Sequence, residues 1–501
     1  MKRLSFLLVL MAVSNTALQA QQLAEIDSVF TVLNQQRGFN GNILIAEKGK
    51  IIYERSFGFS NYDDRTPLRP QHMFNVASVS KTITAVATMQ LVERGLLNLN
   101  DDLTKHLSGL PYQGIRIQHL LSHTSGLPKV QIHPFRKEIS GKGYTNEELL
   151  EVYTRVAPEL YFSPGSNYNY ANTNYIFLAL IIEKISKLSF EQFLQQHIFE
   201  PSGMHRTFLF ERNVPLHLQK NVVSYYRKPK WLSKRFHLVD TLAANIEDSA
   251  TFDNIYGASS IHTTAGDLLK FHTALQNNVL LSIASLTKMY DPITLNGKKE
   301  LTINEKSNYP AVVGTGWQVA KDSTVGKIVY HSGGFQGGRS FLIRNLKKDQ
   351  CVILLTNNVE TDRYTFTTPM RILNRAPYQL DRISLPRLFS NEYISNGIAV
   401  AVSTYQKYKN DTAYVPFVDY DFEEIGTELM NAGDLDAAVK IFELYADTFP
   451  DEYSWSMLGD AHLLSGNESK ALECFEKSLS INSEYGHSKN AVLKIKGGNG
   501  K

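Results

Sequence analysis

Two residues in the first fifth of the chain have the types and spacing for nucleophilic catalysis, namely Ser78 and Lys81. They lie in the stretch Phe74–Gly95, where apolar residues recur at helical spacing, so the pattern predicts a short extended segment that runs into a helix. Residues three apart share a helix face. This spacing suits a serine hydroxyl that attacks a carbonyl and an amine that accepts its proton. The positive end of the helix dipole favours negative charge at Ser78.

The Ser-x-x-Lys pattern is weak evidence when it stands alone. It recurs at Ser285–Lys288, which also lies in a stretch of helical character. A serine and a lysine one turn apart are more often found on a solvated helix face than in an active site. The rest of the chain must therefore decide whether Ser78 has a catalytic role.

A tyrosine and an asparagine at Tyr170 and Asn172 are candidates for the same site. A phenol near a serine and a lysine can relay a proton to a leaving group, and an amide can hold both the lysine and a substrate carbonyl. The Tyr-x-Asn pattern also occurs at Tyr144–Asn146 and Tyr408–Asn410. The alternative interpretation is that Tyr170 packs within its aromatic cluster, 167–175.

A glycine-rich segment at Tyr330–Gly338 provides the third candidate group, His331, Ser332, Gly333 and Gly334. A strand is expected to end here, and glycines allow the backbone to approach a substrate closely. A backbone N–H from this segment and that of Ser78 could form an oxyanion hole. The alternative is a glycine-rich hairpin with a histidine on the surface.

The elements around these residues predict an α+β fold. Runs rich in β-forming residues indicate a hairpin early in the chain and four strands late in it, with helices between them. We expect the early and late strands to form one antiparallel sheet, the helical middle to be an insertion beside it, and the site to lie between the two. The expected helices are 22–37, 146–155, 176–187, 190–199, 265–275 and 363–373, and the expected strands are 42–46, 51–57, 315–320, 327–331, 339–345 and 351–356.

Length and charge limit the function classes. A chain of 501 residues is expected to hold two or three units. Its formal net charge of +3 gives no reason to expect a nucleic-acid partner. The densest basic stretch, 227–235, is interpreted as a solvated loop or as a lid that attracts acidic substrates. It lies in an irregular region, Asn213–Asp253, that we expect to shape specificity.

The first twenty residues, 1–20, read as a secretory signal peptide. Lys2 and Arg3 precede an apolar run, and Ala20 is a small residue at the expected cleavage point. We therefore expect a periplasmic or secreted protein without a membrane span. The two cysteines, Cys351 and Cys474, fall in different predicted domains, so a disulfide is not expected. No cluster has metal-ligand spacing, and no cofactor is predicted.

The C-terminal part changes character. We expect a first domain to cover 21–375, a linker with a short helix near Val402–Lys407 to cover 376–416, and helical repeats to cover 417–495. Four residues recur after a shift of 33, since Gly426, Gly433, Ala438 and Phe442 are followed by Gly459, Gly466, Ala471 and Phe475. This period is similar to that of tetratricopeptide repeats, which are helix–turn–helix units. A generic helical bundle is the alternative. The repeats suggest a protein partner.

Taken together, the three motifs make the chain resemble the serine β-lactamase/penicillin-binding-protein superfamily, in its class C-related esterase and D-aminopeptidase branch. Ser78–Lys81, Tyr170–Asn172 and His331–Gly333 match the boxes of that superfamily in order and with similar spacing. Supporting stretches are FNVASVSK, LLSHTSGLP, PSGM, GTGWQV, HSGGFQGG and ILLTNN, and the resemblance runs from about Leu23 to Leu373.

The resemblance implies a role for each residue. Ser78 would be acylated, Lys81 and Tyr170 would share the acid and base work, and Asn172 would position the substrate. The N–H groups of Ser78 and Gly334 would hold the oxyanion, and His331 and Ser332 would line the opposite side.

One departure bears on the substrate. His331 stands where β-lactamases usually carry lysine, so we expect an esterase or D-amino-acid peptidase or amidase rather than an efficient β-lactamase. The alternative class is a binding protein that recognises cell-wall peptide or β-lactam with little turnover.

Overall fold

The computed structural model describes residues 2–129, 145–209, 221–227, 231–232, 237–238, 255–297, 299–300, 302–303, 309–335, 337–359, 363–380 and 382–498. The chain divides into two compact units. The first comprises Met1–Arg227 and Leu238–Asp381, and the second comprises Lys228–His237 and Arg382–Lys501. Each unit has its own hydrophobic core.

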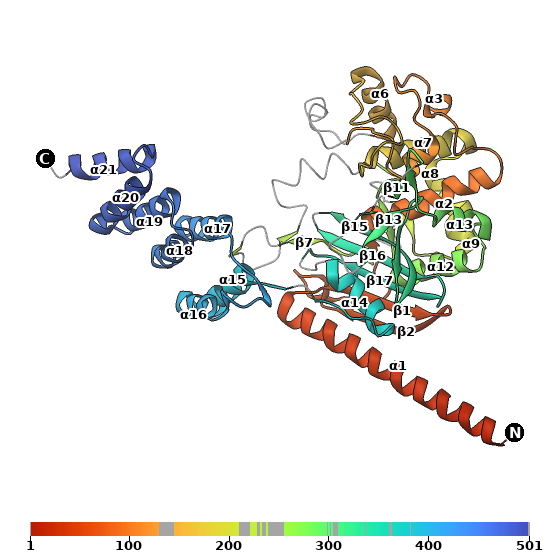
Figure 1. Ribbon diagram of the computed structural model, residues 1–501, viewed down its shortest axis with the longest axis horizontal. Helices are drawn as coiled ribbons and strands as arrows, with labels where there is room; N and C mark the ends of the chain where they lie inside the picture. Colours follow the sequence, from red (N-terminus) through yellow and green to blue (C-terminus); the bar gives the residue numbers. More distant parts are fainter. Residues whose placement is uncertain are drawn as a thin grey trace. The chain divides into compact units, whose positions relative to one another are not determined.

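An eight-stranded sheet forms the centre of the first unit (Figure 1). Its order is β12-β13-β14-β15-β16-β17-β1-β2, and all of its neighbouring strands are antiparallel. The pairing of β1 with β17 joins the early hairpin to the late strands, which confirms the predicted sheet. The strands are β1 (Gly41–Glu47), β2 (Lys50–Phe57), β12 (Thr302–Ile303), β13 (Ala311–Val313), β14 (Gln318–Asp322), β15 (Gly326–Phe335), β16 (Gly338–Asn345) and β17 (Gln350–Thr356).

Apolar side chains cover both faces of this sheet. Successive side chains of a strand point to opposite faces, and in β1 Leu44 belongs to one core cluster while Ile43 and Ile45 belong to the other. Strand β17 alternates in the same way, with Ile353 on the first side and Val352 on the second. The sheet is therefore buried between two layers of helices.

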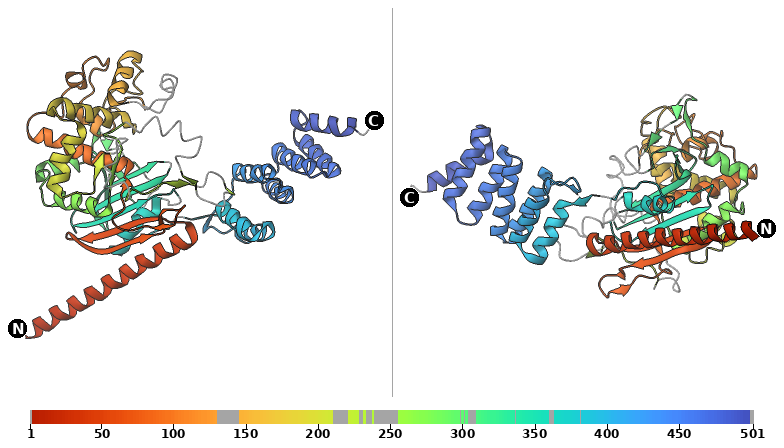
Figure 2. Two further views of the ribbon diagram at one scale, coloured as in Figure 1. Left: turned by 180° about the vertical axis from the view of Figure 1, so that it is seen from behind. Right: turned by 60° about the horizontal axis from the view of Figure 1, so that its bottom comes forward.

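The two layers differ in size. Helices α1 and α14 pack together on one face, and the larger helical set, which includes α2, α7 and α12, lies on the other (Figures 1 and 2). The helices of this unit are α1 (Lys2–Arg37), α2 (Ser80–Glu93), α3 (Leu103–His106), α4 (Ile117–Leu121), α6 (Asn146–Val156), α7 (Asn172–Ser186), α8 (Phe190–Leu194), α9 (Glu200–Ser202), α12 (Ala265–Gln276), α13 (Ile283–Met289) and α14 (Arg363–Leu373). The 3₁₀ turn η1 (Ala77–Val79) leads into α2, and the π turn η2 (Gln195–Phe199) follows α8.

Short strands complete the first unit. A small sheet joins β5 (Phe74–Asn75), β9 (Ile261–Thr263) and β6 (Phe208–Leu209), so the strand before Ser78 pairs with a segment nearly 190 residues further on. The remaining short strands are β3 (Phe59–Asn61), β4 (Thr66–Pro67), β7 (Tyr226–Arg227), β8 (His237–Leu238), β10 (Thr294–Leu295) and β11 (Lys299–Glu300).

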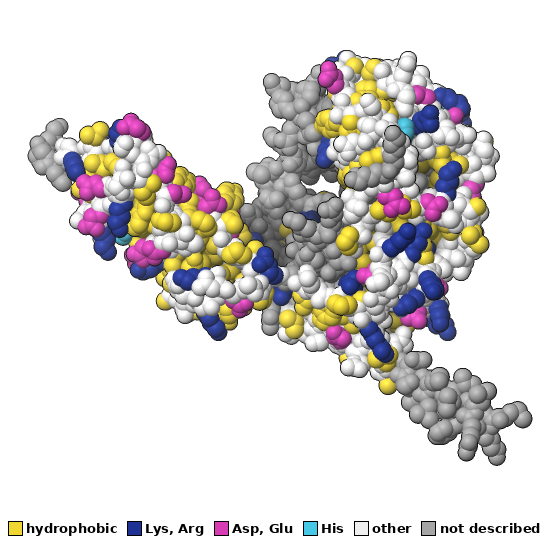
Figure 3. All heavy atoms as spheres, viewed as in Figure 1, with side chains coloured by type: hydrophobic (Ala, Val, Ile, Leu, Met, Phe, Trp, Pro, Cys, Tyr) yellow, Lys and Arg dark blue, Asp and Glu magenta, His cyan; other side chains and the backbone are white. Residues whose placement is uncertain are grey.

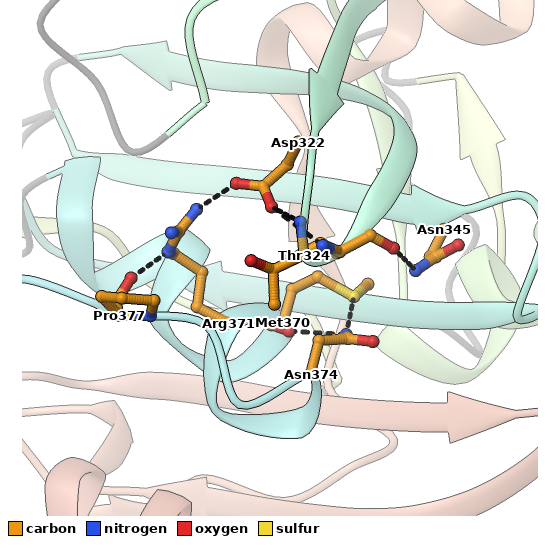
Figure 4. A network of polar contacts seen from close by, with 8 residues as sticks. Asp322, Thr324, Asn345, Met370, Arg371, Asn374 and Pro377 are labelled. Atoms are coloured by element: carbon orange, nitrogen blue, oxygen red, sulfur yellow. Dashed lines mark hydrogen bonds and ion pairs between the residues drawn. The ribbon is translucent and has the colours of Figure 1, made fainter.

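A polar network ties α14 to the turn before β15 (Figure 4). The Arg371 guanidinium donates to Asp322 at 2.9 Å, and Asp322 accepts the backbone N–H groups of Thr324 and Val325 at 2.8 Å each. Asn345 donates to the Val325 carbonyl at 2.9 Å. The half-buried ion pair and the capped turn hold the start of β15, which is the strand that carries His331.

The second unit is helical. It contains β18 (Ile383–Ser384), α15 (Leu385–Asn396), α16 (Ile398–Tyr408), β19 (Tyr414–Val415), α17 (Asp419–Asn431), α18 (Leu435–Thr448), α19 (Glu452–Leu464), α20 (Glu468–Ile481) and α21 (Gly486–Gly498). The predicted linker, 376–416, was therefore wrong over most of its length. Apolar side chains of α15 and α16, among them Phe389 and Tyr405, pack into the core of this unit.

The 33-residue repeat has a direct structural cause. Helix α17 crosses α18 so closely that a Cβ at Gly426 would lie 2.3 Å from Phe442, and one at Gly459 in α19 would lie 2.6 Å from Phe475 in α20. Each recurring glycine thus makes room for the recurring phenylalanine. Gly433 and Gly466, which end the first helix of each pair, have φ values of 78° and 79° that favour glycine.

Charges of both signs are interspersed over the face shown in Figure 3, as the small net charge leads one to expect. No helix in the described part of the chain combines the length and the apolar character needed to cross a membrane.

Candidate active site

The structure brings Ser78 and Lys81 together. Ser78 lies in the 3₁₀ turn η1, and Lys81 is the second residue of α2, one turn further on. The Lys81 Nζ atom lies 2.9 Å from Ser78 Oγ. Ser78 is half-buried, whereas the Lys81 side chain is buried. The hydroxyl can therefore meet a substrate while the amine is shielded from water.

Two further acceptors surround Lys81 Nζ. It lies 2.9 Å from Asn172 Oδ1, at the first residue of α7, and 2.8 Å from the carbonyl oxygen of Ala258. The Thr84 hydroxyl donates to the neighbouring Gly257 carbonyl at 2.6 Å and so fixes the segment that presents Ala258.

The three acceptors around Lys81 Nζ can take the three protons of an ammonium, including a hydrogen bond donated to Ser78 Oγ. In the neutral amine, Asn172 and Ala258 take two protons and the lone pair faces the Ser78 hydroxyl. No carboxylate contributes to the shift of Lys81, and burial lowers its pKa well below 10.5. Lys81 is thus prepared to accept the proton of Ser78.

Tyr170 stands beside this pair. Lys81 Nζ lies 4.9 Å from the centre of the Tyr170 ring. Burial raises the pKa of the Tyr170 hydroxyl, and a hydrogen bond with Ser78 acts in the opposite direction. Desolvation is the larger of the two effects. The phenol therefore keeps its proton and is suited to the role of an acid.

Strand β15 closes the opposite side of the site. The His331 ring lies 6.3 Å from the Tyr170 ring, and its Nδ1–H donates to the Ser332 carbonyl at 2.7 Å. Burial, followed by the nearby Lys81, lowers the pKa of His331 to about 3, so the ring is uncharged at neutral pH. Ser332 and Gly334 are exposed, whereas Gly333 is buried.

Gly333 shows how closely β15 approaches the nucleophile. A Cβ at this position would lie 2.3 Å from the Val76 carbonyl oxygen and 2.9 Å from the Ser78 backbone nitrogen. Only glycine permits this approach. The close contact places the segment that follows His331 against the N–H of Ser78, where the oxyanion hole was predicted.

The turn before Ser78 has a strained backbone. Ala77 has a φ of 44°, which is uncommon for a residue with a side chain. Its N–H donates to Asn75 Oδ1 at 2.8 Å, and the Ser340 hydroxyl of β16 donates to the Val76 carbonyl at 2.6 Å. These bonds hold the turn that presents Ser78 toward β15.

His123 was missed by the sequence analysis, which used its segment only as a supporting stretch for the resemblance. Its ring lies 4.3 Å from the Tyr170 ring, and its Nδ1 accepts the Ala171 N–H at 3.3 Å and the Asn174 amide at 3.1 Å. The bonded Nδ1 and the lowered pKa, caused mainly by burial, indicate a neutral imidazole. His123 thus positions Tyr170. The motif LLSHTSGLP was the available signal. The positive φ of His123, 57°, could not be predicted from the residue types of that motif.

The competing motifs do not form such clusters. Ser285 and Lys288 lie on α13, where Lys288 is exposed, as expected for a solvated helix face. Tyr408 and Asn410 lie in the second unit, and Tyr144 lies outside the described residues. Most of Asn213–Asp253, including the lysines of the basic stretch, also lies outside them.

A small, partly open hollow adjoins the cluster. Side chains from both halves of the site line it, among them His123, Tyr168, Tyr170, Trp317 and His331. Its lining is largely aromatic and uncharged at neutral pH.

Comparison with known proteins agrees with this geometry. A family model described as Beta-lactamase matches residues 26–376, and one described as Tetratricopeptide repeat matches 453–485. Among curated proteins, Penicillin-binding protein 4* of Bacillus subtilis is 30% identical over 395 residues, which is 76% of this chain and 85% of that protein. The putative penicillin-binding protein PbpX of the same organism is 27% identical over 68% of this chain and 77% of its own length.

Among solved structures, the octameric penicillin-binding protein homologue of Pyrococcus abyssi superimposes with a TM-score of 0.60 at 24% identity. That match covers 71% of this chain and 78% of the other. The D-amino acid amidase of Ochrobactrum anthropi has a TM-score of 0.56 at 20% identity, with 72% and 97% covered. These likenesses show the fold. Because the first family model spans well over half of the chain, the protein belongs to the beta-lactamase family and carries a tetratricopeptide repeat in its C-terminal unit.

Proposed function

We propose that the protein is a serine hydrolase that works through an acyl-enzyme on Ser78. The observation that carries the proposal is the position of Lys81 Nζ, within 2.9 Å of Ser78 Oγ, Asn172 Oδ1 and the Ala258 carbonyl. A buried amine with its lone pair toward a half-buried hydroxyl is an arrangement for activating that hydroxyl. A protein that only bound its ligand would not need it.

Each step of this hydrolysis can be assigned to a side chain or backbone group. Ser78 Oγ attacks the substrate carbonyl while its proton passes to Lys81. The N–H groups of Ser78 and Gly334 stabilise the resulting oxyanion. The Tyr170 hydroxyl gives a proton to the leaving alcohol or amine, and Asn172 orients the substrate. Water then attacks the acyl group, its hydroxyl goes to the released acid and its proton to Ser78, and the proton held by Lys81 passes to Tyr170 so that both groups return to their starting states.

The charge of the two histidines bears on the substrate class. His331 is neutral, and burial also keeps His123 neutral, so neither supplies a cation for a substrate carboxylate. Penicillins carry such a carboxylate. We therefore propose an ester or a D-amino-acid-containing peptide or amide as substrate, with only weak β-lactam hydrolysis.

We also propose that the mature protein begins near Gln21 and acts in the periplasm or outside the cell. Contacts between α1 and the rest of its unit are found beyond the proposed cleavage point. Gln22 Nε2 donates to the Ile372 carbonyl at 2.8 Å, and Ile26 and Phe30 are buried in the core. Removal of residues 1–20 would leave these contacts in place. The tetratricopeptide repeat supports a protein partner for the second unit.

The second candidate is a penicillin-binding protein with slow turnover, and the name of the Bacillus subtilis relative supports it. Deacylation separates the two candidates. A hydrolase releases its acyl group within seconds to minutes, whereas a binder retains it.

The test compares three substrates, a p-nitrophenyl ester, a D-alanine p-nitroanilide and a chromogenic cephalosporin. Each is assayed with the wild type, with Ser78→Ala, and with Ser285→Ala as the matched control. We expect ester or D-amide turnover that is lost only in Ser78→Ala and that exceeds cephalosporin turnover. The cephalosporin as the best substrate would refute the proposed class. A stable adduct without turnover would favour the binder.

A further inference from the structure

The first unit contains an arginine that is buried within its core. Arg344 lies on β16, and its side chain is 1% exposed. Its Nε–H donates to His272 Nδ1 on α12 at 2.9 Å, and its Nη1 donates to the Tyr290 hydroxyl at the end of α13. A buried charge is costly unless it is paired and hydrogen-bonded. The surroundings of Arg344 must therefore balance its charge.

His272 links Arg344 to an acid. Because arginine only donates hydrogen bonds, His272 Nδ1 is the acceptor and the ring proton lies on Nε2. This Nε2 atom lies 3.0 Å from Asp349 Oδ1, in the turn between β16 and β17. Burial lowers the pKa of His272 to about 4, so the ring is neutral, and its hydrogen bond lowers the pKa of the Asp349 carboxyl. A cation, a neutral imidazole and an anion thus form one continuous chain.

The guanidinium of Arg344 packs against two aromatic rings. Its Cζ atom lies 5.4 Å from the centre of the Trp317 ring and 5.7 Å from that of Tyr290. The two rings meet edge to face, with their centres 6.0 Å apart. The Trp317 indole N–H is buried and has no acceptor among the described residues. The indole is therefore held by the cation and by Tyr290 rather than by a hydrogen bond of its own.

Trp317 belongs to a segment that lies against the helix of the candidate base. This segment, 314–317, joins β13 to β14. Gly316 has a φ of 75°, and a Cβ there would lie 2.3 Å from Ala85 Cβ and 3.6 Å from the Lys81 carbonyl oxygen. Trp317 itself borders the hollow beside the site. A shift of Trp317 would therefore reach the first turns of α2 and the wall of the hollow.

We propose that Arg344 is a positioning residue of the active site, which acts through Trp317 on the helix that carries Lys81. His272 holds the guanidinium in the orientation that this contact requires. The inference rests on the proposed function of Ser78. An arginine that only stabilised the fold would change the unfolding of the protein. It would alter neither kcat of the folded protein nor the surroundings of Trp317.

Four variants of the full-length protein test this role. Arg344→Met removes the charge and both hydrogen bonds, and a buried charge can often be replaced by an apolar residue of similar size. His272→Ala removes the acceptor for Arg344, whereas His272→Gln keeps an acceptor and a donor. The matched control is Arg55→Met on β2, the same exchange at an arginine that lies 4.5 Å from the Phe57 ring and 2.6 Å from Asp27.

Three quantities are measured well below the melting temperature of each variant. The first is kcat and KM for a p-nitrophenyl ester. The second is the rate at which a fluorophosphonate labels Ser78, which does not require turnover. The third is the quenching of Trp317 fluorescence by acrylamide, in a background that carries Trp231→Phe and Trp455→Phe so that Trp317 is the single tryptophan.

We expect Arg344→Met and His272→Ala to lower kcat and the labelling rate about tenfold, because small displacements of reacting groups are costly in rate. KM should change less than kcat. Acrylamide should quench Trp317 more strongly in both variants, since the indole has lost the cation that holds it. His272→Gln should restore the rates and the quenching toward the wild type, and Arg55→Met should leave them unchanged.

Several results would overturn the inference. A folded Arg344→Met variant with wild-type kcat and labelling would refute it and leave the proposed function intact. A lowered kcat with unchanged quenching would refute the action through Trp317, and equal rates in the two His272 variants would refute the hydrogen-bonded chain. The His272 pair makes the same comparison if Arg344→Met does not fold. A wild type that neither cleaves the ester nor is labelled at Ser78 would refute the proposed function, and this inference with it.

Discussion

Gly333→Ala is the substitution for which the structure yields the most definite expectation. The added Cβ would lie 2.3 Å from the Val76 carbonyl oxygen and from Ser340 Oγ, and 2.9 Å from the Ser78 backbone nitrogen. Ordinary van der Waals contact begins at 3.4 Å, so β15 and η1 must separate by about 1.1 Å. Two of the three atoms belong to the backbone and cannot rotate away.

The expected consequence is a loss of activity in a folded protein. A displacement of about 1 Å between reacting groups can cost about 100-fold in rate. Overpacking typically lowers the free energy of unfolding by about 1–3 kcal/mol, which most domains tolerate. We therefore expect kcat/KM for the ester to fall about 100-fold, with thermal unfolding still cooperative.

The matched control is Gly266→Ala in α12, where the nearest atom to the new Cβ lies 3.8 Å away. It should keep kcat/KM within about twofold of the wild type, since surface exchanges rarely exceed about 0.5 kcal/mol. A folded Gly333→Ala variant with wild-type kcat/KM would show that β15 does not lie against the nucleophile, and the reasoning would fail.

Four other outcomes are expected. Lys81→Met should lower ester turnover about 10²–10⁴-fold. In the wild type, the rate should rise with pH as Lys81 loses its proton, at a pKa well below 10.5. An unaltered rate in Lys81→Met would exclude Lys81 as the base. His123→Ala should reduce kcat about tenfold. His123→Asn keeps an acceptor for the Ala171 N–H and should therefore have a higher kcat than His123→Ala. Equal kcat values in the two variants would exclude the positioning of Tyr170 through His123 Nδ1. Gly426→Ala should lower the stability of the second unit by about 1–3 kcal/mol in denaturant titrations, and Gly486→Ala, which meets no atom within 4 Å, should not. Calorimetry should show that the melting temperature falls as the pH is lowered from 6.5 toward 4. Four buried histidines have lowered pKa values in the native protein, so the unfolded chain binds more protons than the native one in this range. They are His123, His262, His272 and His331.

Patterns of neighbouring and regularly spaced residues were sufficient to predict several helices and strands. The β-rich run Asn42–Ala46 predicted β1, and the recurrence of Gly426 and Phe442 predicted the paired helices. The Ser78–Lys81 contact was also predictable, since residues three apart share a helix face.

What the sequence could not show depends on contacts between distant segments. The Ala258 carbonyl reaches Lys81 from 177 residues away, and a backbone oxygen leaves no mark in the residue pattern. His123 has a left-handed backbone conformation, which its residue type does not predict. Helix α15 was not predicted because its residues show little clear periodicity, and its Pro386 lies in the first turn, where proline is acceptable.

The identity of Ser78 as the acylated nucleophile is tested most directly by intact-protein mass spectrometry after mixing with penicillin or a p-nitrophenyl ester. The account predicts a covalent adduct of one acyl group on the wild type and on Ser285→Ala, with none on Ser78→Ala. An adduct that persists in Ser78→Ala would contradict it.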